Sequence, residues 1–231
     1  MLDTVREPEV GGDDSPTVLS NKPAKSKLKG VAVCGSHPAT VANAPFDDEG
    51  WLIYACSPDN SPFGHGREAK ALPRVDAWFE IHVPCFDKTL PYGYHEWLGT
   101  IPKVYMRDQV AMSLHTKDGR PLFPTAVPYP DAEMRGTKKL LPNGAIDFKP
   151  GRFHRSQFKS SIAFIMAKAI VDCIEQGIPA IGLWGILQAS EGEYKTQRAS
   201  TQYFLEEAHR AGIKTFVPPE SALFHDDPEI F

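Results

Sequence analysis

The stretch that decides the fold is residues 160–184, SSIAFIMAKAIVDCIEQGIPAIGLW. Its apolar side chains recur at steps of three and four residues, which predicts a helix with one apolar stripe made by Ile162, Ile165, Met166, Ala169, Ile170, Cys173 and Ile174. Ser160 or Ser161 can cap the start of this helix, and Gly177 can end it. Residues 180–184 (AIGLW) then form a short apolar run closed by Gly185, as expected of a buried parallel strand.

The alternation of strand and helix continues on both sides of this stretch. Toward the C-terminus, residues 198–211 predict a second helix, which Gly212 stops, and residues 213–217 predict another strand. Toward the N-terminus, apolar runs predict a brief helix at residues 94–98 and strands at residues 30–35, 51–56, 75–82 and 103–106. This order indicates an α/β fold of the Rossmann-like, doubly wound kind with a mostly parallel sheet.

Two segments depart from this pattern. Residues 1–28 hold few large apolar side chains, so we expect a flexible N-terminal tail in front of one domain at residues 29–231. Residues 113–151 are rich in Pro and Gly and only weakly periodic, which is typical of an insertion or a lid. Such an insertion or lid can contain a hairpin, and a plain surface excursion is the alternative. We expect this stretch to cover the ligand site.

Composition narrows the classes of function. The 231 residues are 42% hydrophobic and carry a net charge of -4, which gives no basic footprint for nucleic acid. The four cysteines form no CxxC pair and the histidines show no metal spacing, so we expect reduced thiols and no metal. No apolar run reaches the ~20 residues of a membrane helix, and the first residues lack the apolar part of a secretory signal. We therefore expect a cytoplasmic protein without a membrane partner.

Ligands of open parallel sheets bind beyond the carboxyl ends of the strands, and this rule selects candidate loops. Gly35 and Ser36 follow the first strand, where they form either a phosphate-binding loop or a tight strand-to-helix turn. Asn60 follows the second strand, as a contact to a nucleoside or as an ordinary turn residue. Glu80 and His82 project from one face of the third strand, as an acid/base pair or as a satisfied polar pair.

The loop after residues 180–184 adds charged side chains to these candidates. Glu193 and Arg198 belong to a polar group that leads into a helix, and Arg198 is placed to balance the charge of an anionic ligand. A solvated loop is the alternative. On the ligand-binding interpretation we expect six residues to converge on one cleft: Gly35, Ser36, Glu80, His82, Glu193 and Arg198.

Several motifs resemble a known group of enzymes. The loop with Gly35, Ser36 and Pro38, followed by WLIYACS at 51–57, resembles the opening of the bacterial family 42 sialyltransferases and the related pterin diphosphokinase-like domains, which have a GNGPS loop there. Residues 160–166 resemble their TSGVYM helix start, and residues 178–185 resemble their YKEIYLSG strand. The pattern from APFDDEGW at 44–51 to EYKTQR at 193–198 is also similar to a group of phage-encoded proteins.

The resemblance to the sialyltransferases implies a nucleotide-dependent, glycosyltransferase-like transferase that uses a nucleotide or nucleotide-sugar. The likeness to phage-encoded proteins implies that this transferase is phage-encoded. Leu187 stands where the sialyltransferases have an acidic residue, and their catalytic histidine has no counterpart here. A non-catalytic Rossmann-like binding or structural module, such as a component of a phage particle, is therefore the alternative. The expected partners are a nucleotide-type small molecule and either further copies of the chain or a phage assembly.

Overall fold

The computed structural model describes residues 26–63, 71–82, 93–142, 144–188 and 192–224. Within these residues a seven-stranded sheet has the order β5-β4-β3-β2-β1-β8-β9, and every neighbouring pair in it is parallel. The strands are β1 (Gly30–Cys34), β2 (Trp51–Ala55), β3 (Ala77–Glu80), β4 (Val104–Met106), β5 (Ala126–Pro128), β8 (Ala180–Trp184) and β9 (Lys214–Phe216). The predicted Rossmann-like α/β fold is confirmed.

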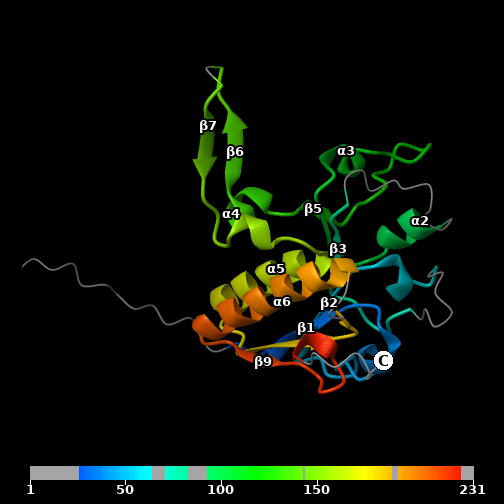
Figure 1. Cartoon of the computed structure of the whole chain (residues 1–231). Coiled ribbons are helices and arrows are strands. Elements are labelled where there is room, and N and C mark those ends of the chain that lie inside the picture. Colours follow the sequence, from blue (N-terminus) through cyan, green and yellow to red (C-terminus); the bar gives the residue numbers. More distant parts are fainter. Residues whose placement is uncertain (1–25, 64–70, 83–92, 143, 189–191, 225–231) are drawn as a thin grey trace, which may run out of the picture.

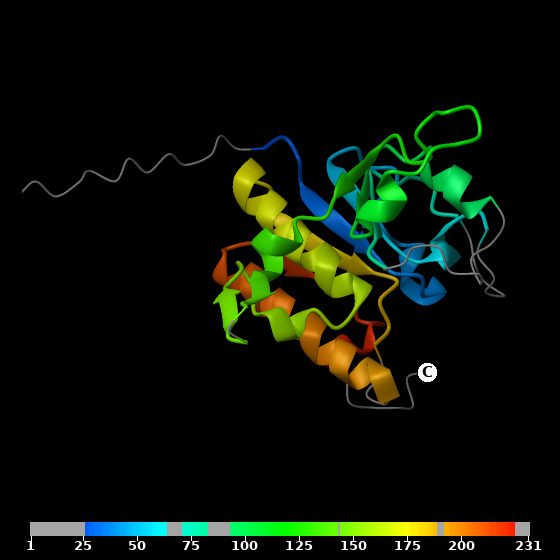
Figure 2. The same ribbon diagram turned by 90° about the horizontal axis from the view of Figure 1, so that it is seen from above.

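Helices cover both faces of this sheet (Figures 1 and 2). On one face α5 (Ser161–Gln176) contacts β1, β2, β3 and β8, and α6 (Gly192–Arg210) packs against α5 and β9. Short helices lie over the opposite face, namely α1 (Pro38–Val41), α2 (Tyr94–Leu98) and α3 (Gln109–Met112). No helix in the described residues is long and apolar enough to cross a membrane.

The strand pattern divides the core into two layers. Because successive side chains of a strand point to opposite faces, β1 sends Val31 and Val33 toward α5 and α6, and Ala32 and Cys34 toward the short helices. Both faces are therefore buried, which is why the sequence of this strand is uniformly apolar.

The two ends of α5 lie where the sequence predicts them. Ser160 Oγ accepts a hydrogen bond from the Ala163 amide at 3.3 Å, and Gly177 ends the helix with a φ of 66°. The second long helix starts earlier than predicted, at Gly192 and not at residue 198. Its first turns lack an apolar stripe, so hydrophobic periodicity could not locate them.

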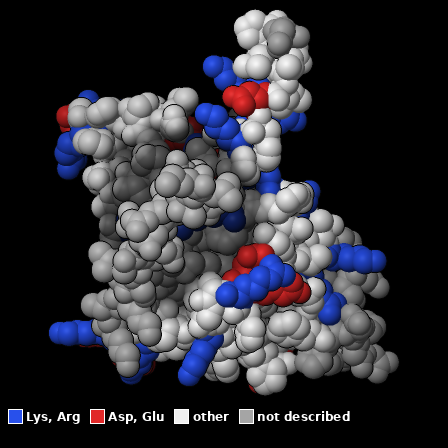
Figure 3. Space-filling view, turned by 90° about the vertical axis from the view of Figure 1, so that its left-hand side faces the viewer, with Lys and Arg blue, Asp and Glu red and all other residues white. Residues whose placement is uncertain are grey.

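Residues 113–151 hold regular structure that weak periodicity concealed. They contribute the edge strand β5, the short helix α4 (Asp131–Arg135), and an antiparallel hairpin of β6 (Thr137–Leu140) and β7 (Ile146–Lys149). Every residue of the hairpin strands is exposed, and the hairpin stands away from the body (Figures 1 and 3). The stretch is therefore an insertion with a projecting hairpin.

Most of the predicted tail, residues 1–25, lies outside the described residues. Leu28, the last residue assigned to the tail, packs against the core. The domain therefore begins slightly before residue 29.

The carboxyl ends of β1 and β8 meet through two glycines. The Gly35 amide donates to the Trp184 carbonyl at 2.8 Å, and the His37 amide donates to the Gly185 carbonyl at 2.9 Å. A Cβ on Gly35 would lie 2.3 Å from the Gly185 carbonyl oxygen, and a Cβ on Gly185 (φ +65°) would lie 2.4 Å from the Gly35 carbonyl oxygen. Since backbone atoms fill the space, neither position accepts a side chain.

We expect Gly35→Ala to lower the free energy of unfolding by about 3 kcal/mol, because the added methyl group must separate two hydrogen-bonded strand ends. Gly119→Asn is the matched control: Gly119 has nothing within 4 Å of its missing Cβ, and Asn tolerates its positive φ. Urea unfolding followed by circular dichroism measures both variants. A Gly35→Ala protein as stable as the control would show that the contact is not tight in solution.

Candidate functional site

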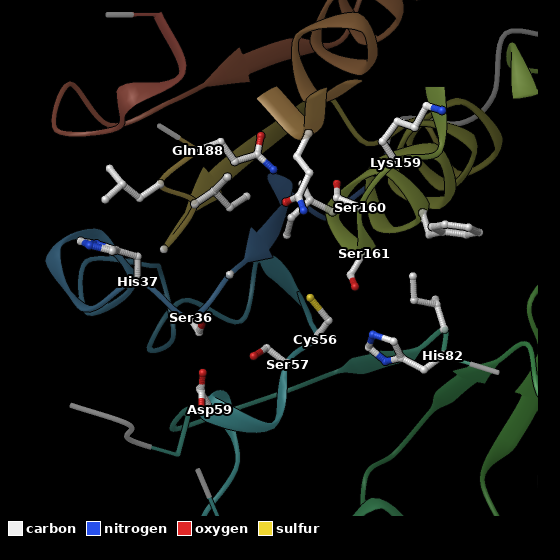
Figure 4. A pocket seen from close by; sticks show the side chains of 18 of the residues that line it. Ser36, His37, Cys56, Ser57, Asp59, His82, Lys159, Ser160, Ser161 and Gln188 are labelled. Carbon is white, nitrogen blue, oxygen red and sulfur yellow. The ribbon is translucent and has the colours of Figure 1, made fainter. Parts of the chain in front are cut away.

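A cavity of about 840 Å³ lies at the carboxyl edge of the sheet (Figure 4). Its position is the switch point of the fold, because the chain runs from β1 toward β5 on one side and from β8 to β9 on the other. We call it the edge cavity. The loops after β1, β2, β3, β4 and β8 line it together with the start of α5, through Gly35, Ser36, Cys56, Ser57, Ile81, His82, Arg107, Ser160, Ser161, Ile186, Leu187 and Gln188.

The start of α5 supplies hydrogen-bond donors to the edge cavity. Ser160, Ser161 and Ile162 all line the cavity. The Ala163 amide already donates to Ser160, whereas the amides of Ser161 and Ile162 have no acceptor within their own helix. The helix dipole places partial positive charge beside them. An anion at this point would accept hydrogen bonds directly from the backbone.

Three cations surround this helix start: Arg107, Arg135 and Lys159 line the edge cavity. Arg107 Nε lies 2.9 Å from Asp131 Oδ2, and Arg135 Nη1 lies 3.1 Å from Asp131 Oδ1. Both guanidinium groups also lie over the ring of Phe164, at 4.9 and 5.2 Å from its centroid. Asp131 thus supplies one negative charge to two guanidinium groups, so the net charge of this part of the wall is positive.

Glu80 and His82 form a pair at another wall of the edge cavity. His82 Nδ1 lies 3.0 Å from Glu80 Oε1, and the side chain of His82 is 69% exposed whereas that of Glu80 is 5% exposed. The other Glu80 oxygen accepts from Tyr94 OH at 2.8 Å. Burial, and next the charge of Glu80, hold the pKa of Tyr94 well above its usual range, so Tyr94 remains a donor. His82 therefore lines the cavity, and the buried Glu80 fixes the orientation of the His82 ring.

Asn60 does not point its amide nitrogen at a ligand. Asn60 is 2% exposed, and its Nδ2 donates to the carbonyl oxygens of Cys56 at 2.8 Å and Gly35 at 3.1 Å. It therefore ties the end of β2 to the end of β1. Asn60 is a structural clamp at the floor of the site, and its contact to a nucleoside stays a prediction.

Ser57 adds a strained backbone at the same place. It is the one described non-glycine residue with a positive φ, +77°, and it lines the edge cavity between β2 and the turn η1 (Pro58–Asn60). Such conformations cost about 1–3 kcal/mol each and occur mainly at functional sites.

Arg198 does not join the wall of the edge cavity as expected. Arg198 is 9% exposed, and its Nε donates to the Leu223 carbonyl at 3.0 Å. It therefore holds η3 (Ala222–Phe224) against α6, and its neighbour Gln197 lines the cavity in its place. Glu193 lies in the first turn of α6, but its side chain is outside the described residues.

The expected cleft is thus formed with a different set of residues. Gly35, Ser36 and His82 line it as predicted. Of the described residues in 113–151, Arg135 alone lines it, so this stretch contributes a wall residue and not a cover. Among the described residues no group of three His, Cys, Asp or Glu could hold a metal ion.

Arg107, Arg135, Lys159 and Gln188 line the edge cavity but were not predicted from the sequence. Arg107 directly follows a predicted strand and Lys159 directly precedes a predicted cap, so the strand-end rule could have selected both. Gln188 is 4% exposed, and its Oε1 is a buried oxygen without a hydrogen-bond partner in the described part of the chain. Arg135 carried no signal, because its helix lies in the irregular stretch.

Comparison with protein-family models, with curated proteins and with solved structures found no match to this chain. The resemblance to the family 42 sialyltransferases therefore remains an expectation from motifs, and the site has to be interpreted from its own geometry.

We expect Arg198→Ala to lower the free energy of unfolding by about 1–3 kcal/mol, because it removes a buried charged donor from the Leu223 carbonyl. Gln202 also donates to this carbonyl, at 2.6 Å, so the oxygen keeps one partner. Arg210→Ala is the control, since Arg210 pairs with Glu206 on the exposed surface of the same helix. Thermal unfolding distinguishes the two. If the Arg198→Ala protein is as stable as the native chain but binds the ligand more weakly, Arg198 contacts the ligand and is not a structural residue.

We expect the Cys56 thiol to resist alkylation in the folded protein, although Cys56 lines the edge cavity. Cys56 is 4% exposed, and burial, with Glu80 second, raises its pKa to about 12. Since the thiolate is the reactive form, iodoacetamide at pH 8 should label Cys56 only after unfolding. Peptide mass spectrometry of native and urea-treated samples measures this. Rapid labelling of Cys56 in the native protein would mean that the cavity opens far enough to expose the Cys56 thiol to the reagent.

Proposed function

We propose that this chain binds a nucleotide-type ligand in the edge cavity and acts as a nucleotide-dependent, glycosyltransferase-like transferase. The observation that carries the proposal is the meeting of the first turn of α5 with Arg107, Arg135 and Lys159 at the switch point of the sheet. Backbone donors and guanidinium groups at one place are the partners that phosphate oxygens require.

The charge balance of the wall favours an anion of more than one charge. Arg107 and Arg135 share Asp131, and Lys159 has no ion-pair partner among the described residues. A cavity with low-dielectric walls strengthens the attraction of such groups for an anion. A diphosphate or a phosphate ester would offset this charge.

Gln188 supports a polar ligand independently of charge. A buried amide oxygen without a partner costs about 1–3 kcal/mol, and a ligand hydroxyl or amine in the cavity would recover this energy. Because Gln188 follows β8 and the cations lie near α5 and β4, a ligand that meets both has polar groups at two separate positions.

In the proposed transfer the chain positions two reactants and one proton acceptor. The acceptor hydroxyl oxygen bonds to the anomeric carbon, and the bond from that carbon to the phosphate oxygen breaks with its electron pair leaving on the phosphate. The amides of α5 and the nearby cations stabilise that leaving charge. The hydroxyl proton passes to His82, whose ring Glu80 orients through Nδ1.

A binding module in an assembly, such as a phage particle, is the second candidate, and the projecting hairpin favours it. Cross-strand pairing puts Leu140, Ile146 and Phe148 on one face of the hairpin, where they are 70%, 55% and 53% exposed. Exposed apolar residues grouped in this way are typical of interaction surfaces.

We expect Ser161→Asp to weaken binding of the ligand at least tenfold without loss of stability. A carboxylate at the first position of α5 interacts favourably with the helix dipole, but it repels a phosphate at the same amides. A thermal-shift screen with CMP, UDP, GDP and dTDP sugars and their free nucleotides identifies the ligand, and titration calorimetry gives its Kd for each variant.

Gln109→Asp is the matched control, because it adds the same charge at the first position of α3, outside the edge cavity. Its ligand affinity should equal that of the native chain. If no compound in the screen shifts the melting temperature of the native chain, nucleotide binding is rejected in favour of the binding-module alternative.

A further inference from the structure

A second cavity adjoins the edge cavity. It has a volume of about 610 Å³, and it shares Ser36, Pro38 and Asp59 with the edge cavity. We call it the side cavity. Since the two cavities have wall residues in common, one ligand can occupy both.

Apart from the shared residues and Asn60, the described residues that line the side cavity are apolar. Val41, Phe46 and Leu72 line it and are partly buried against the core beneath it. Among the described residues no Lys or Arg lines it, in contrast to the edge cavity. Its volume is within the range of about 300–1,000 Å³ typical of small-molecule sites. Such walls suit a flat, uncharged group and disfavour a phosphate.

Asp59 stands at the junction of the two cavities. It lies in η1, directly after β2, and its carboxylate has no hydrogen-bond or ion-pair partner among the described residues. Figure 4 shows the carboxylate facing the space beside Ser36 and Ser57. A ligand that occupies both cavities therefore meets a hydrogen-bond acceptor at the junction between them.

A free carboxylate here determines how a nucleotide can lie. It repels phosphate, and it accepts hydrogen bonds from neutral donors such as hydroxyl groups. Two adjacent hydroxyls of a ribose can donate to its two oxygens, and an acidic side chain near the end of the second strand has this role in other parallel α/β folds. Phosphates at α5, ribose at Asp59 and base in the side cavity then follow one another in order.

The backbone around Asp59 is held rigidly. Asn60 Nδ2 donates to the carbonyl oxygens of Gly35 and Cys56, and the Leu72 amide donates to the Asn60 carbonyl at 3.1 Å. Asn60 is therefore a positioning residue that fixes its neighbour Asp59 relative to both strand ends. A preformed acceptor loses little freedom when a ligand binds.

We propose that Asp59 binds the 2′- and 3′-hydroxyls of a ribonucleotide whose base occupies the side cavity. The inference rests on the proposed function, because it requires the phosphates to lie in the edge cavity. It goes beyond that function by naming the sugar that the site selects and the place of the base.

Titration calorimetry on the full chain tests the proposal with CMP, UMP, AMP and GMP, their 2′-deoxy counterparts, and inorganic pyrophosphate. For the base that binds, the ribonucleotide should bind the native chain about tenfold more tightly than the 2′-deoxynucleotide, since one charged hydrogen bond separates them. Asp59→Ala, which removes both acceptor oxygens, should abolish this preference and leave pyrophosphate binding intact or tighter. Glu49→Ala, which removes an exposed carboxylate outside both cavities, should change none of these values.

A second variant tests the position of the base. Ala42 is exposed, lines the side cavity and has an ordinary helical φ of -63°, so Ala42→Phe should fold normally and fill the space. It should weaken nucleotide binding about tenfold or more and leave pyrophosphate binding unchanged. Equal weakening of pyrophosphate binding would overturn this placement.

The outcomes separate the two proposals. Pyrophosphate binding without a ribonucleotide preference, or a preference that survives in Asp59→Ala, overturns the role of Asp59 and leaves the proposed function standing. If the native chain binds neither pyrophosphate nor any nucleotide, both proposals fail together.

Discussion

The close approach of β1 and β8 is the constraint on which the site depends. Gly35 and Gly185 bring two backbones together where side chains would ordinarily keep them apart. Because the strands remain in contact to their ends, the loops that follow them must diverge, one toward α1 and the other toward α6, and the edge cavity opens between them. Asn60 then hydrogen-bonds to the Gly35 carbonyl and holds the end of β2 at the same level. The glycine contact thus positions three strand ends, and the ligand-facing groups lie on the loops that leave them.

The arrangement of the sheet was largely predictable, because a strand that is buried on both faces has an apolar side chain at nearly every position. The central strands are uniformly apolar, and α5 carries a regular stripe between a serine cap and a terminal glycine. The edge strand β5 was missed because its short apolar run, Ala126 and Val127, lies between Pro124 and Pro128 in a stretch rich in Pro and Gly. The start of α6 was missed because its first turns carry no stripe. Elements that a regular apolar pattern marks were predicted, and elements without such a pattern were missed.

The position of the candidate site was predictable from the sequence, but only some of the residues that line it were. The strand-end rule depends on topology, and it correctly selected Gly35, Ser36 and His82. It could not foresee that Arg198 would turn away to the Leu223 carbonyl, because the partner lies far along the chain and is a backbone group with no sequence signature. The same reason explains Asn60, whose acceptors are also carbonyl oxygens. Hydrogen bonds to the backbone decide which polar residues remain available to a ligand, and a sequence does not display them.

The pairing of β1 with β8 also has a consequence for synthesis on the ribosome. Val31 lies opposite Ile181, so β1, the first strand in the described part of the chain, waits for a partner made about 150 residues later. At ~5–20 residues per second, this delay is about 8–30 s. During that interval β1 and β2 can pair with each other, but the apolar face that α5 later covers remains open to solvent or to a chaperone. The nascent chain therefore passes through a stage in which five of the seven strands, β1 to β5, exist without β8, and the ligand site is completed only when β8 arrives.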